Sequence, residues 1–248
     1  QEPHDGLRQA ADADDAARSR LLWVNSPGNP AGGLDDLEAA AAWGRERGIV
    51  VCSDECYVEY TWSGAPVGEV GLPASTMLSS GTSGVLALHS LSKRSNLAGG
   101  RIGFYAGDAA LIAELGERRR ELGLVVPGPM QAAGATAWSD QQHVTEQRER
   151  YLRRLERLAE AAVSAGCFDV RLPEGGFYLW LDVGDDDRAA VATLAGAGVL
   201  VQPGSIYGAA GAGRVRLAAV RPDAEIDEAA RRLEALRGVL AGGAGLRR

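Results

Sequence analysis

Lys93 is the only lysine in a chain that carries 26 basic residues, so the remaining 25 are arginines (26 − 1 = 25). Arginine replaces lysine in most ion pairs, but its guanidinium stays protonated and does not attack carbonyl groups. The amine of a lysine can attack an aldehyde and form a Schiff base. Lys93 is therefore a candidate nucleophile, although survival by chance explains a single lysine equally well when composition alone is considered.

Polar side chains gather in three short segments, each directly after a predicted strand. The first is Asn29-Pro30, the second runs from Asp54 to Tyr57, and the third runs from Ser90 to Arg101. Open α/β sheets bind ligands at the carboxyl ends of their strands. Each segment alone is weak evidence for a ligand site, since an Asn before Pro also forms turns and an Asp also caps helices. The ordered set, with the only lysine inside it, predicts a ligand site.

Strands and helices are predicted to alternate in the first part of the chain. Short apolar runs predict strands at 21–24, 49–52, 85–89 and 102–106. Helices are predicted at 34–47, where Gly48 suits a C-cap, and at 108–123 and 130–138. Such alternation is typical of a mostly parallel sheet, so residues 1–138 are predicted to form a large α/β domain.

The pattern changes after this point. A long helix rich in Arg and Glu is predicted at 141–165, and shorter helices are predicted at 187–197 and 224–239. Short strands are predicted between these helices, at 168–172, 177–183, 199–202 and 214–220. Residues 139–248 are therefore predicted to form a smaller α+β domain, with a disordered Gly- and Ala-rich end from residue 241.

Composition fits a folded protein, with 46% hydrophobic and 24% charged residues in a chain of 248. No apolar stretch is long enough for a membrane span, and the net charge of −7 comes without a basic patch. Neither a membrane nor a nucleic acid is therefore an expected partner. The cysteines and histidines lack the spacing of metal ligands, which predicts no metal site and reduced thiols in a cytoplasmic protein.

Five segments resemble, in order and spacing, the motifs of the pyridoxal-phosphate (PLP) dependent class I/II aminotransferases of fold type I. They are NSPGNPAG (25–32), SDECY (53–57), HSLSKRSNLAGGRIGF (89–104), PEGGFYLWLDV (173–183) and RVRLA (214–218). The resemblance implies the PLP-dependent transferase fold, with a large cofactor domain and a small C-terminal domain. It also implies pyridoxal 5'-phosphate as cofactor, a small-molecule amino acid and 2-oxo acid as substrates, and a homodimer.

The resemblance implies roles for four residues around the reactive part of the cofactor. Lys93 matches the lysine that holds PLP as a Schiff base and then acts as a general base. Asp54 matches the carboxylate that keeps the pyridine nitrogen protonated. Tyr57 and Asn29 match the groups that donate hydrogen bonds to the phenolic oxygen of the cofactor.

The phosphate of the cofactor is expected to bind to a different group of residues. Ser90, Ser92 and Arg101 match the residues that bind it in the family, and two hydroxyls with a guanidinium suit a dianion. Arg94 lies next to the lysine but does not occupy that position of the motif. Its side chain is expected either to be solvated or to contact the residues that bind the cofactor without contacting the cofactor itself.

The substrate carboxylate is expected to bind to Arg216, which matches the arginine of the family that grips it. Asn29 is expected to contact the substrate as well. Arg214 is the alternative to Arg216, because residues two apart on a strand face the same side.

The N-terminal part of the family pattern is not identifiable in residues 1–20. Family members carry there an arm, a loop that binds the phosphate, and an aromatic residue that stacks on the pyridine ring. We therefore expect a partial chain with an incomplete large domain.

Two further segments, VPGPMQAA (126–133) and YGAAGAGRVRLA (207–218), are similar to the succinyldiaminopimelate aminotransferases of high-GC bacteria. This resemblance implies transfer of an amino group from glutamate to N-succinyl-2-amino-6-oxopimelate, a step of lysine biosynthesis.

Two alternatives stay open at this point. Another class I/II aminotransferase or a PLP-dependent carbon–sulfur lyase keeps the same lysine and aspartate, so the motifs do not separate these reactions. A truncated, non-catalytic remnant or the ligand-binding module of a regulator is the second alternative, although no helix-turn-helix is visible.

Overall fold

The computed structural model describes residues 18–62 and 76–240, and these fold into two compact units. Among the described residues, unit 1 comprises 18–28, 33–62 and 76–146, and unit 2 comprises 29–32 and 147–240. The division therefore falls later than the sequence-based boundary at 138/139, inside a continuous helix that has no breaker to mark it. Residues 1–17 and the Gly- and Ala-rich end, which was predicted to be disordered from residue 241, lie outside the described residues.

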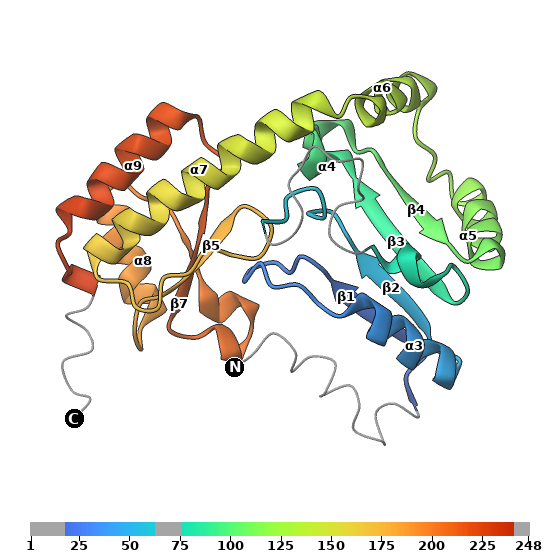
Figure 1. The fold of residues 1–248 in the computed structure, drawn as a ribbon, viewed down its shortest axis with the longest axis horizontal. Helices are drawn as coiled ribbons and strands as arrows, with labels where there is room; N and C mark the ends of the chain where they lie inside the picture. The colour runs from blue at the N-terminus through green and yellow to red at the C-terminus, as the bar shows by residue number, and fades with distance from the viewer. Residues whose placement is uncertain (1–17, 63–75, 241–248) are drawn as a thin grey trace. The chain divides into compact units, whose positions relative to one another are not determined.

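Unit 1 contains a four-stranded sheet in the order β1-β2-β3-β4 (Figure 1). Its strands are β1 (Leu21–Asn25), β2 (Val50–Asp54), β3 (Val85–Ser90) and β4 (Gly103–Gly107). The first three strands are parallel and β4 is antiparallel to β3, which confirms the predicted mostly parallel sheet. The register aligns Asn25 with Asp54, and Asp54 with Leu88. The segments that follow β1, β2 and β3 therefore leave the sheet at one edge.

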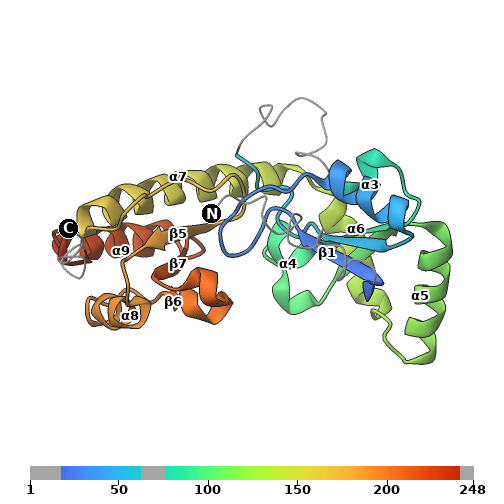
Figure 2. The same ribbon diagram turned by 90° about the horizontal axis from the view of Figure 1, so that it is seen from below.

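Three helices of unit 1 begin and end close to the predicted residues: α3 (Leu37–Arg47), α5 (Ala109–Glu121) and α6 (Gly128–Ser139). Three shorter helical elements were not predicted: η1 (Met77–Ser80), α4 (Leu91–Arg94) and η2 (Ala98–Gly100). Helix α3 ends at Gly48, whose φ of 64° is the left-handed conformation that glycine adopts without strain. Figure 2 shows α3 beside the sheet, and Figure 1 shows α5 following β4.

The core of unit 1 joins α3 to the sheet. Its buried residues come from β1, α3, β2, η1 and β3: Val24, Leu37, Ala40, Ala41, Val51, Met77, Val85 and Ala87. Small alanines on α3 allow the helix to pack close to β2. The strand ends are therefore fixed by a packed interior, and the loops after them start from rigid points.

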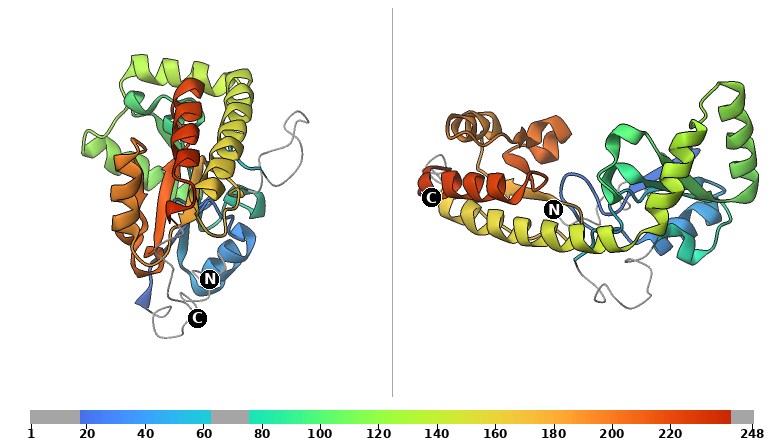
Figure 3. Two further views of the ribbon diagram at one scale, coloured as in Figure 1. Left: turned by 90° about the vertical axis from the view of Figure 1, so that its left-hand side faces the viewer. Right: turned by 90° about the horizontal axis from the view of Figure 1, so that it is seen from above.

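Unit 2 contains a three-stranded antiparallel sheet in the order β5-β7-β6. Its strands are β5 (Tyr178–Asp182), β6 (Gln202–Pro203) and β7 (Arg214–Ala218). Its helical elements are α7 (Gln142–Ala165), α8 (Asp187–Gly196), η3 (Gly204–Tyr207), η4 (Ala209–Gly211) and α9 (Asp223–Ala235). The first residues of α7 belong to unit 1. Figures 2 and 3 show α7 and α9 on one face of this sheet and α8 on the other. This arrangement is the predicted α+β unit.

Two predicted strands of unit 2 are shorter than the apolar pattern suggests. At 168–172, only Phe168 pairs, in an isolated bridge with Asp182, because Asp169 has a φ of 44° and leaves the extended conformation. At 199–202, Leu200 is 84% exposed and pairing is confined to β6. Across residues 18–62 and 76–240, we find no helix with the length and apolar character that crossing a membrane requires.

Candidate functional site

Asp54 and Ser90 end β2 and β3, and both line one cavity of about 980 Å³ in unit 1. Ser92 and Arg101, which the sequence placed with Ser90, line the same cavity. Arg101 is exposed, has a φ of 51°, and donates from Nη1 to the carbonyl of Ala98 at 3.0 Å. Four residues of the second and third polar segments therefore line one cavity, and their side chains carry a carboxylate, two hydroxyls and a guanidinium.

Lys93 lies in α4, a helix of four residues that starts directly after β3. The Ser90 hydroxyl accepts from the Ser92 N–H at 3.1 Å and caps the start of this helix. The Nζ atom of Lys93 lies 5.9 Å from the centroid of the Tyr57 ring, and Tyr57 is buried. The structure therefore brings the lysine and the tyrosine of the two segments together.

The Tyr60 side chain holds the end of α4. Its ring is fully buried, and its hydroxyl donates toward the carbonyl oxygens of Lys93, at 3.1 Å, and of Arg94, at 2.8 Å. The last carbonyls of a helix have no intrahelical partner, so this hydroxyl satisfies two of them at once. Sequence reasoning missed Tyr60, which gives no signal beyond lying three residues after Tyr57.

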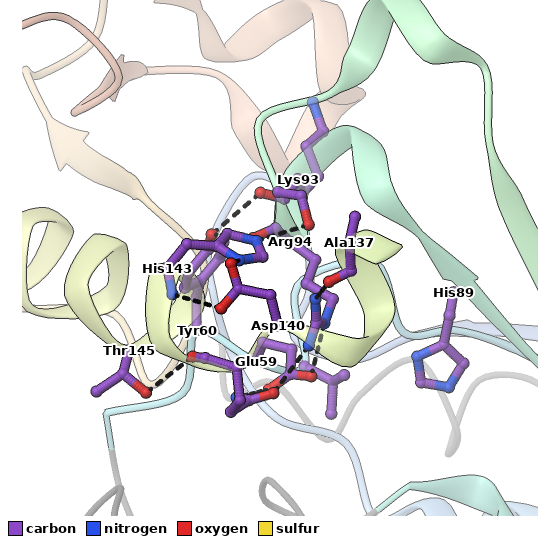
Figure 4. A network of polar contacts seen from close by, with 12 residues as sticks. Glu59, Tyr60, His89, Lys93, Arg94, Ala137, Asp140, His143 and Thr145 are labelled. Atoms are coloured by element: carbon purple, nitrogen blue, oxygen red, sulfur yellow. Dashed lines mark hydrogen bonds and ion pairs between the residues drawn. The ribbon is translucent and has the colours of Figure 1, made fainter. Parts of the chain in front are cut away.

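Arg94 is buried, with 4% exposure, and Figure 4 shows the polar contacts around it. Nε donates to Glu59 Oε1 at 3.2 Å, Nη1 to the Ala137 carbonyl at 2.8 Å, and Nη2 to Gln141 Oε1 at 2.8 Å. The guanidinium carbon also lies 4.9 Å from the centroid of the Trp138 ring. The solvated alternative for Arg94 was therefore wrong, because the local sequence does not reveal acceptors that lie far along the chain.

The carboxylate of Asp54 is oriented by the turn after β2. Its Oδ1 accepts from the Cys56 N–H at 3.1 Å. Burial, together with a hydrogen bond to Asp54, raises the pKa of the Cys56 thiol to about 12. The thiol is therefore protonated at neutral pH, and it can donate to the carboxylate instead of acting as a nucleophile.

Glu55 and His89 form a second polar pair, each next to a predicted site residue. Glu55 is fully buried, and its Oε1 accepts from the Met77 N–H at 2.7 Å while its Oε2 lies 3.2 Å from His89 Nε2. Burial alone raises the pKa of Glu55, but the contacts with His89, Met77 and Thr76 outweigh it and lower the pKa below its usual value. Sequence reasoning missed this pair, because no motif links the two positions.

In unit 2, Arg216 projects from β7 between two aromatic rings. Its guanidinium carbon lies 4.1 Å from the ring centroid of Tyr178 and 5.4 Å from that of Tyr207. Nη1 donates to Asn29 Oδ1 at 2.7 Å, so the structure joins the two predicted substrate ligands. Nε is buried and has no acceptor among residues 18–62 and 76–240. A guanidinium that is held by two aromatic rings and an amide oxygen, with no protein carboxylate paired to it among these residues, suits an anionic ligand.

Arg214, the alternative to Arg216, has a different environment. Its Nη2 atom lies 3.9 Å from Asp182 Oδ2 on the neighbouring strand. A carboxylate of the protein thus already faces Arg214, whereas Arg216 faces an amide oxygen and two rings. This difference favours Arg216 as the ligand of an external carboxylate.

Gly32 fixes the segment that carries Asn29 within unit 2. Its carbonyl accepts from the Gly175 N–H at 2.9 Å, and its φ is 75°. A Cβ atom at this position would lie 2.4 Å from the Pro173 Cβ and 2.5 Å from the Gly175 oxygen. Only glycine at position 32 therefore allows the two backbone segments to approach this closely.

Residues 4–233 match the family described as Aminotransferase class I and II. The chain is 45% identical over 217 residues to the 4-dedimethylamino-4-oxo-anhydrotetracycline transaminase of Streptomyces rimosus, covering 86% of this chain and 59% of that protein. It is 43% identical over 216 residues to a probable aminotransferase of Mycobacterium tuberculosis, covering 86% of this chain and 51% of that protein. The chain thus spans little more than half the length of these relatives.

Solved structures agree with these sequence matches. An aminotransferase from Neisseria meningitidis gives a TM-score of 0.80 at 35% identity, over 93% of this chain and 61% of that one. A probable N-succinyldiaminopimelate aminotransferase from Thermus thermophilus gives a TM-score of 0.77 at 29% identity, over 92% of this chain and 61% of that one.

Proposed function

We propose that this chain forms the cofactor-bearing part of an enzyme that moves an amino group from an amino acid to a 2-oxo acid. The chain belongs to the class I and II aminotransferase family. The observation that carries the proposal is the position of the only lysine, on a short helix directly after β3. The same strand end contributes to a cavity lined by Asp54, Ser90, Ser92 and Arg101. The family and its fold depend on PLP.

The chemistry of these side chains fits PLP. The amine of Lys93 suits the aldehyde, the Asp54 carboxylate suits a protonated pyridine nitrogen, and the two hydroxyls with Arg101 suit a phosphate dianion. We propose that Tyr57 and Asn29 donate to the phenolic oxygen. Bound PLP supplies an electron sink for the negative charge that develops at the substrate Cα.

Lys93 has two proposed roles. Its amine would hold the cofactor through the aldehyde, and the same amine would hold or move the proton of the substrate Cα. No other lysine is present to take over either role. Cys56 does not compete for the aldehyde, because burial and Asp54 raise the pKa of its thiol to about 12.

Asp54 is proposed to hold a proton on the ring nitrogen. A carboxylate opposite this nitrogen favours its protonated form, which is the better electron acceptor. The hydrogen bond from the Cys56 N–H, at 3.1 Å, fixes the orientation of the carboxylate group. Support for this role comes from the cavity that Asp54 shares with the proposed phosphate ligands.

Arg216 is proposed to bind the α-carboxylate of the substrate, with Asn29 contributing to the same site. Support comes from the buried Nε atom, which lacks an acceptor in the described part of the chain, and from the two tyrosine rings that hold the guanidinium. Asn29 Oδ1 occupies one Nη atom and so fixes the rotation of the planar fork.

For the substrates, we propose glutamate as donor and N-succinyl-2-amino-6-oxopimelate as acceptor. Support comes from the VPGPMQAA and YGAAGAGRVRLA segments and from the likeness to the Thermus thermophilus structure. The Streptomyces rimosus relative is named for a 4-oxo-anhydrotetracycline acceptor, and a ring ketone therefore belongs in the same test. We also propose a homodimer, which sedimentation equilibrium would test.

The first experiment is to incubate the chain with PLP, reduce it with borohydride and map the phosphopyridoxyl group by mass spectrometry. We expect the label on Lys93 and none in Lys93→Arg, which keeps the charge but cannot attack an aldehyde. A label confined to the N-terminal amine, or no label, would contradict the proposal for this chain.

The second experiment supplies glutamate with a panel of oxo acceptors and measures the 2-oxoglutarate formed. The proposed acceptor is expected to give the highest kcat/KM in the panel. Release of pyruvate and ammonia from cystathionine, without any acceptor, would instead indicate a carbon–sulfur lyase.

A further inference from the structure

We infer that Arg94 is a positioning residue whose buried guanidinium fixes the helix that carries Lys93, and thereby fixes where the lysine amine meets an aldehyde. The inference rests on the role proposed for Lys93. Figure 4 shows the two side chains leaving α4 in different directions, so Arg94 acts through the backbone and not by contact with the amine.

Helix α4 cannot hold itself in place. It has four residues, and a helix of this length is unstable alone, because nucleation fixes several residues for one hydrogen bond. Its first residue follows β3, and the Ser90 hydroxyl caps this end. The other end continues into a loop, so contacts with neighbouring elements must determine where Lys93 lies.

The Tyr60 hydroxyl holds the backbone at the end of α4, and Arg94 adds side-chain contacts with three different segments. Glu59 lies in the chain that follows β2, Ala137 lies near the end of α6, and Gln141 lies between α6 and α7. Each guanidinium nitrogen has its own acceptor, and Gln141 Nε2 also lies 3.4 Å from Glu59 Oε2. Since the guanidinium is planar and rigid, acceptors in three directions fix both its position and its orientation.

Ser95 adds a second connection to the same region. Its Oγ lies 2.9 Å from His143 Nε2, and His143 Nδ1 lies 2.9 Å from Asp140 Oδ2, which lowers the pKa of Asp140. These distances match those of a serine hydrolase triad, but Ser95 is the C-cap of α4. The C-terminal end of a helix carries partial negative charge and does not stabilise an oxyanion. The arrangement therefore connects α4 to the start of α7.

Arg94 is not itself a ligand of the cofactor or the substrate. Its side chain is 4% exposed, and all three of its nitrogens donate to protein acceptors. An external phosphate or carboxylate would have to displace one of these buried partners. The residue after Lys93 therefore has a supporting role, in contrast to Arg101 on the wall of the cavity.

Loss of the guanidinium should change two properties of Lys93 in opposite directions. A freed α4 exposes the amine to small reagents in solution, so its reaction with trinitrobenzenesulfonate becomes faster. The same freedom removes the fixed approach to PLP, so covalent attachment becomes less complete. General unfolding would also speed the first reaction, but it would appear as a lower unfolding midpoint in urea.

The test compares Arg94→Gln with the wild-type chain and with Arg171→Gln, an arginine whose side chain is 79% exposed. The single lysine makes both assays specific when the modified peptide is measured by mass spectrometry. We expect Arg94→Gln to react with trinitrobenzenesulfonate about tenfold faster and to need about tenfold more PLP for half-maximal borohydride labelling. Both measurements are made in conditions where each protein is folded, and Arg171→Gln should match the wild type.

Two further variants keep the inference testable if Arg94→Gln does not fold. Gln141→Ala removes one acceptor from the exposed side and should shift both readouts about threefold in the same directions. Arg94→Ala should be restored in part by millimolar guanidinium chloride and not by equal sodium chloride. Arg94→Lys is unsuitable, because it adds a second amine.

Unchanged trinitrophenylation and labelling in folded Arg94→Gln would overturn the inference, as would equal shifts in Arg171→Gln. If the wild-type chain takes no phosphopyridoxyl label, the proposed function of this chain fails. The trinitrophenylation rates then still decide whether Arg94 positions Lys93.

Discussion

Two arginines illustrate different uses of one side chain. Arg94, in unit 1, is almost fully buried, and each of its nitrogens donates to a protein acceptor. Arg216, in unit 2, is held by two tyrosine rings and one amide oxygen, and its Nε has no acceptor among the residues described. Every nitrogen of the Arg94 guanidinium donates a hydrogen bond to the protein, whereas the Nε atom of Arg216 donates none within the described residues.

The difference separates support from binding. A buried guanidinium with all its acceptors stabilises the fold around it, because the loss of any partner leaves a desolvated charge. Stacking on aromatic faces restricts a guanidinium without using its N–H groups, so that these remain directed at a ligand. The number of unused donors, rather than burial alone, is why we propose Arg216 and not Arg94 as the ligand of the substrate.

The largest expected effect is on catalysis by Arg216→Gln. We expect kcat/KM for an amino acid substrate to fall by about 100- to 1,000-fold, the loss expected when a bidentate charged contact is removed. The free energy of unfolding should change by less than about 1 kcal/mol. Steady-state kinetics and urea unfolding measure the two quantities. A larger kinetic effect in Arg214→Gln would reassign the carboxylate site.

Arg94→Gln should have a large effect on the stability of the fold, in contrast to Arg216→Gln. We expect the free energy of unfolding to fall by about 3 kcal/mol, because Glu59 and two further acceptors lose a charged partner. Urea unfolding followed by circular dichroism measures this change. Arg171→Gln, at an exposed position, should cost less than about 0.5 kcal/mol. Equal stability of the two variants would contradict the supporting role of Arg94.

Glu55→Gln should alter how stability depends on pH. The contacts of Glu55 lower its pKa below the usual value in the folded chain. Its stabilising effect is therefore complete above the usual pKa of glutamate and is lost as the pH falls through the lower pKa of the folded state. In this acidic range, the free energy of unfolding should depend less steeply on pH in the variant than in the wild type. The difference in slope should reach up to about 1.4 kcal/mol per pH unit, the value for the uptake of one proton. Unfolding in urea at a series of pH values tests this, and an unchanged slope would contradict it.

The smallest expected effect concerns the ring that stacks on Arg216. Tyr207→Leu removes one of its two aromatic partners, and we expect KM to rise about threefold, as loss of a partly exposed cation–π contact implies. Tyr207→Phe keeps the ring and loses only the hydrogen bond to Gln202, so its KM should stay near that of the wild type. If Tyr207→Phe matched the leucine variant, the hydroxyl and not the ring would be responsible.

Periodicity and breakers predicted most elements of the fold. The apolar run after Gly48 gave β2, and the long Arg- and Glu-rich pattern gave α7. Periodicity failed at Leu200, which is apolar but 84% exposed, because the pattern does not show which apolar residues find a partner. It also gave no sign that Asn29–Gly32 belongs to unit 2, since this depends on a contact with Gly175.

The site was predicted as far as motif spacing allows. The structure brings Lys93 beside Tyr57, and it places Asp54 with the three proposed phosphate ligands around one cavity. The residues that support them were not predictable. Arg94 binds acceptors 35 and 47 positions away, and no local rule links an arginine to partners at such separations.

The four residues of Asn29–Gly32 limit how this protein can be recombined with its relatives. They precede most of unit 1 in the sequence, yet they belong to unit 2 and provide the oxygen that holds Arg216. A chimera joined at one crossover near Gln147 would take Arg216 from one parent and Asn29 from the other. A graft that keeps this hydrogen bond therefore requires a second crossover pair around Asn29–Gly32, so that both halves of the proposed carboxylate site come from the same parent.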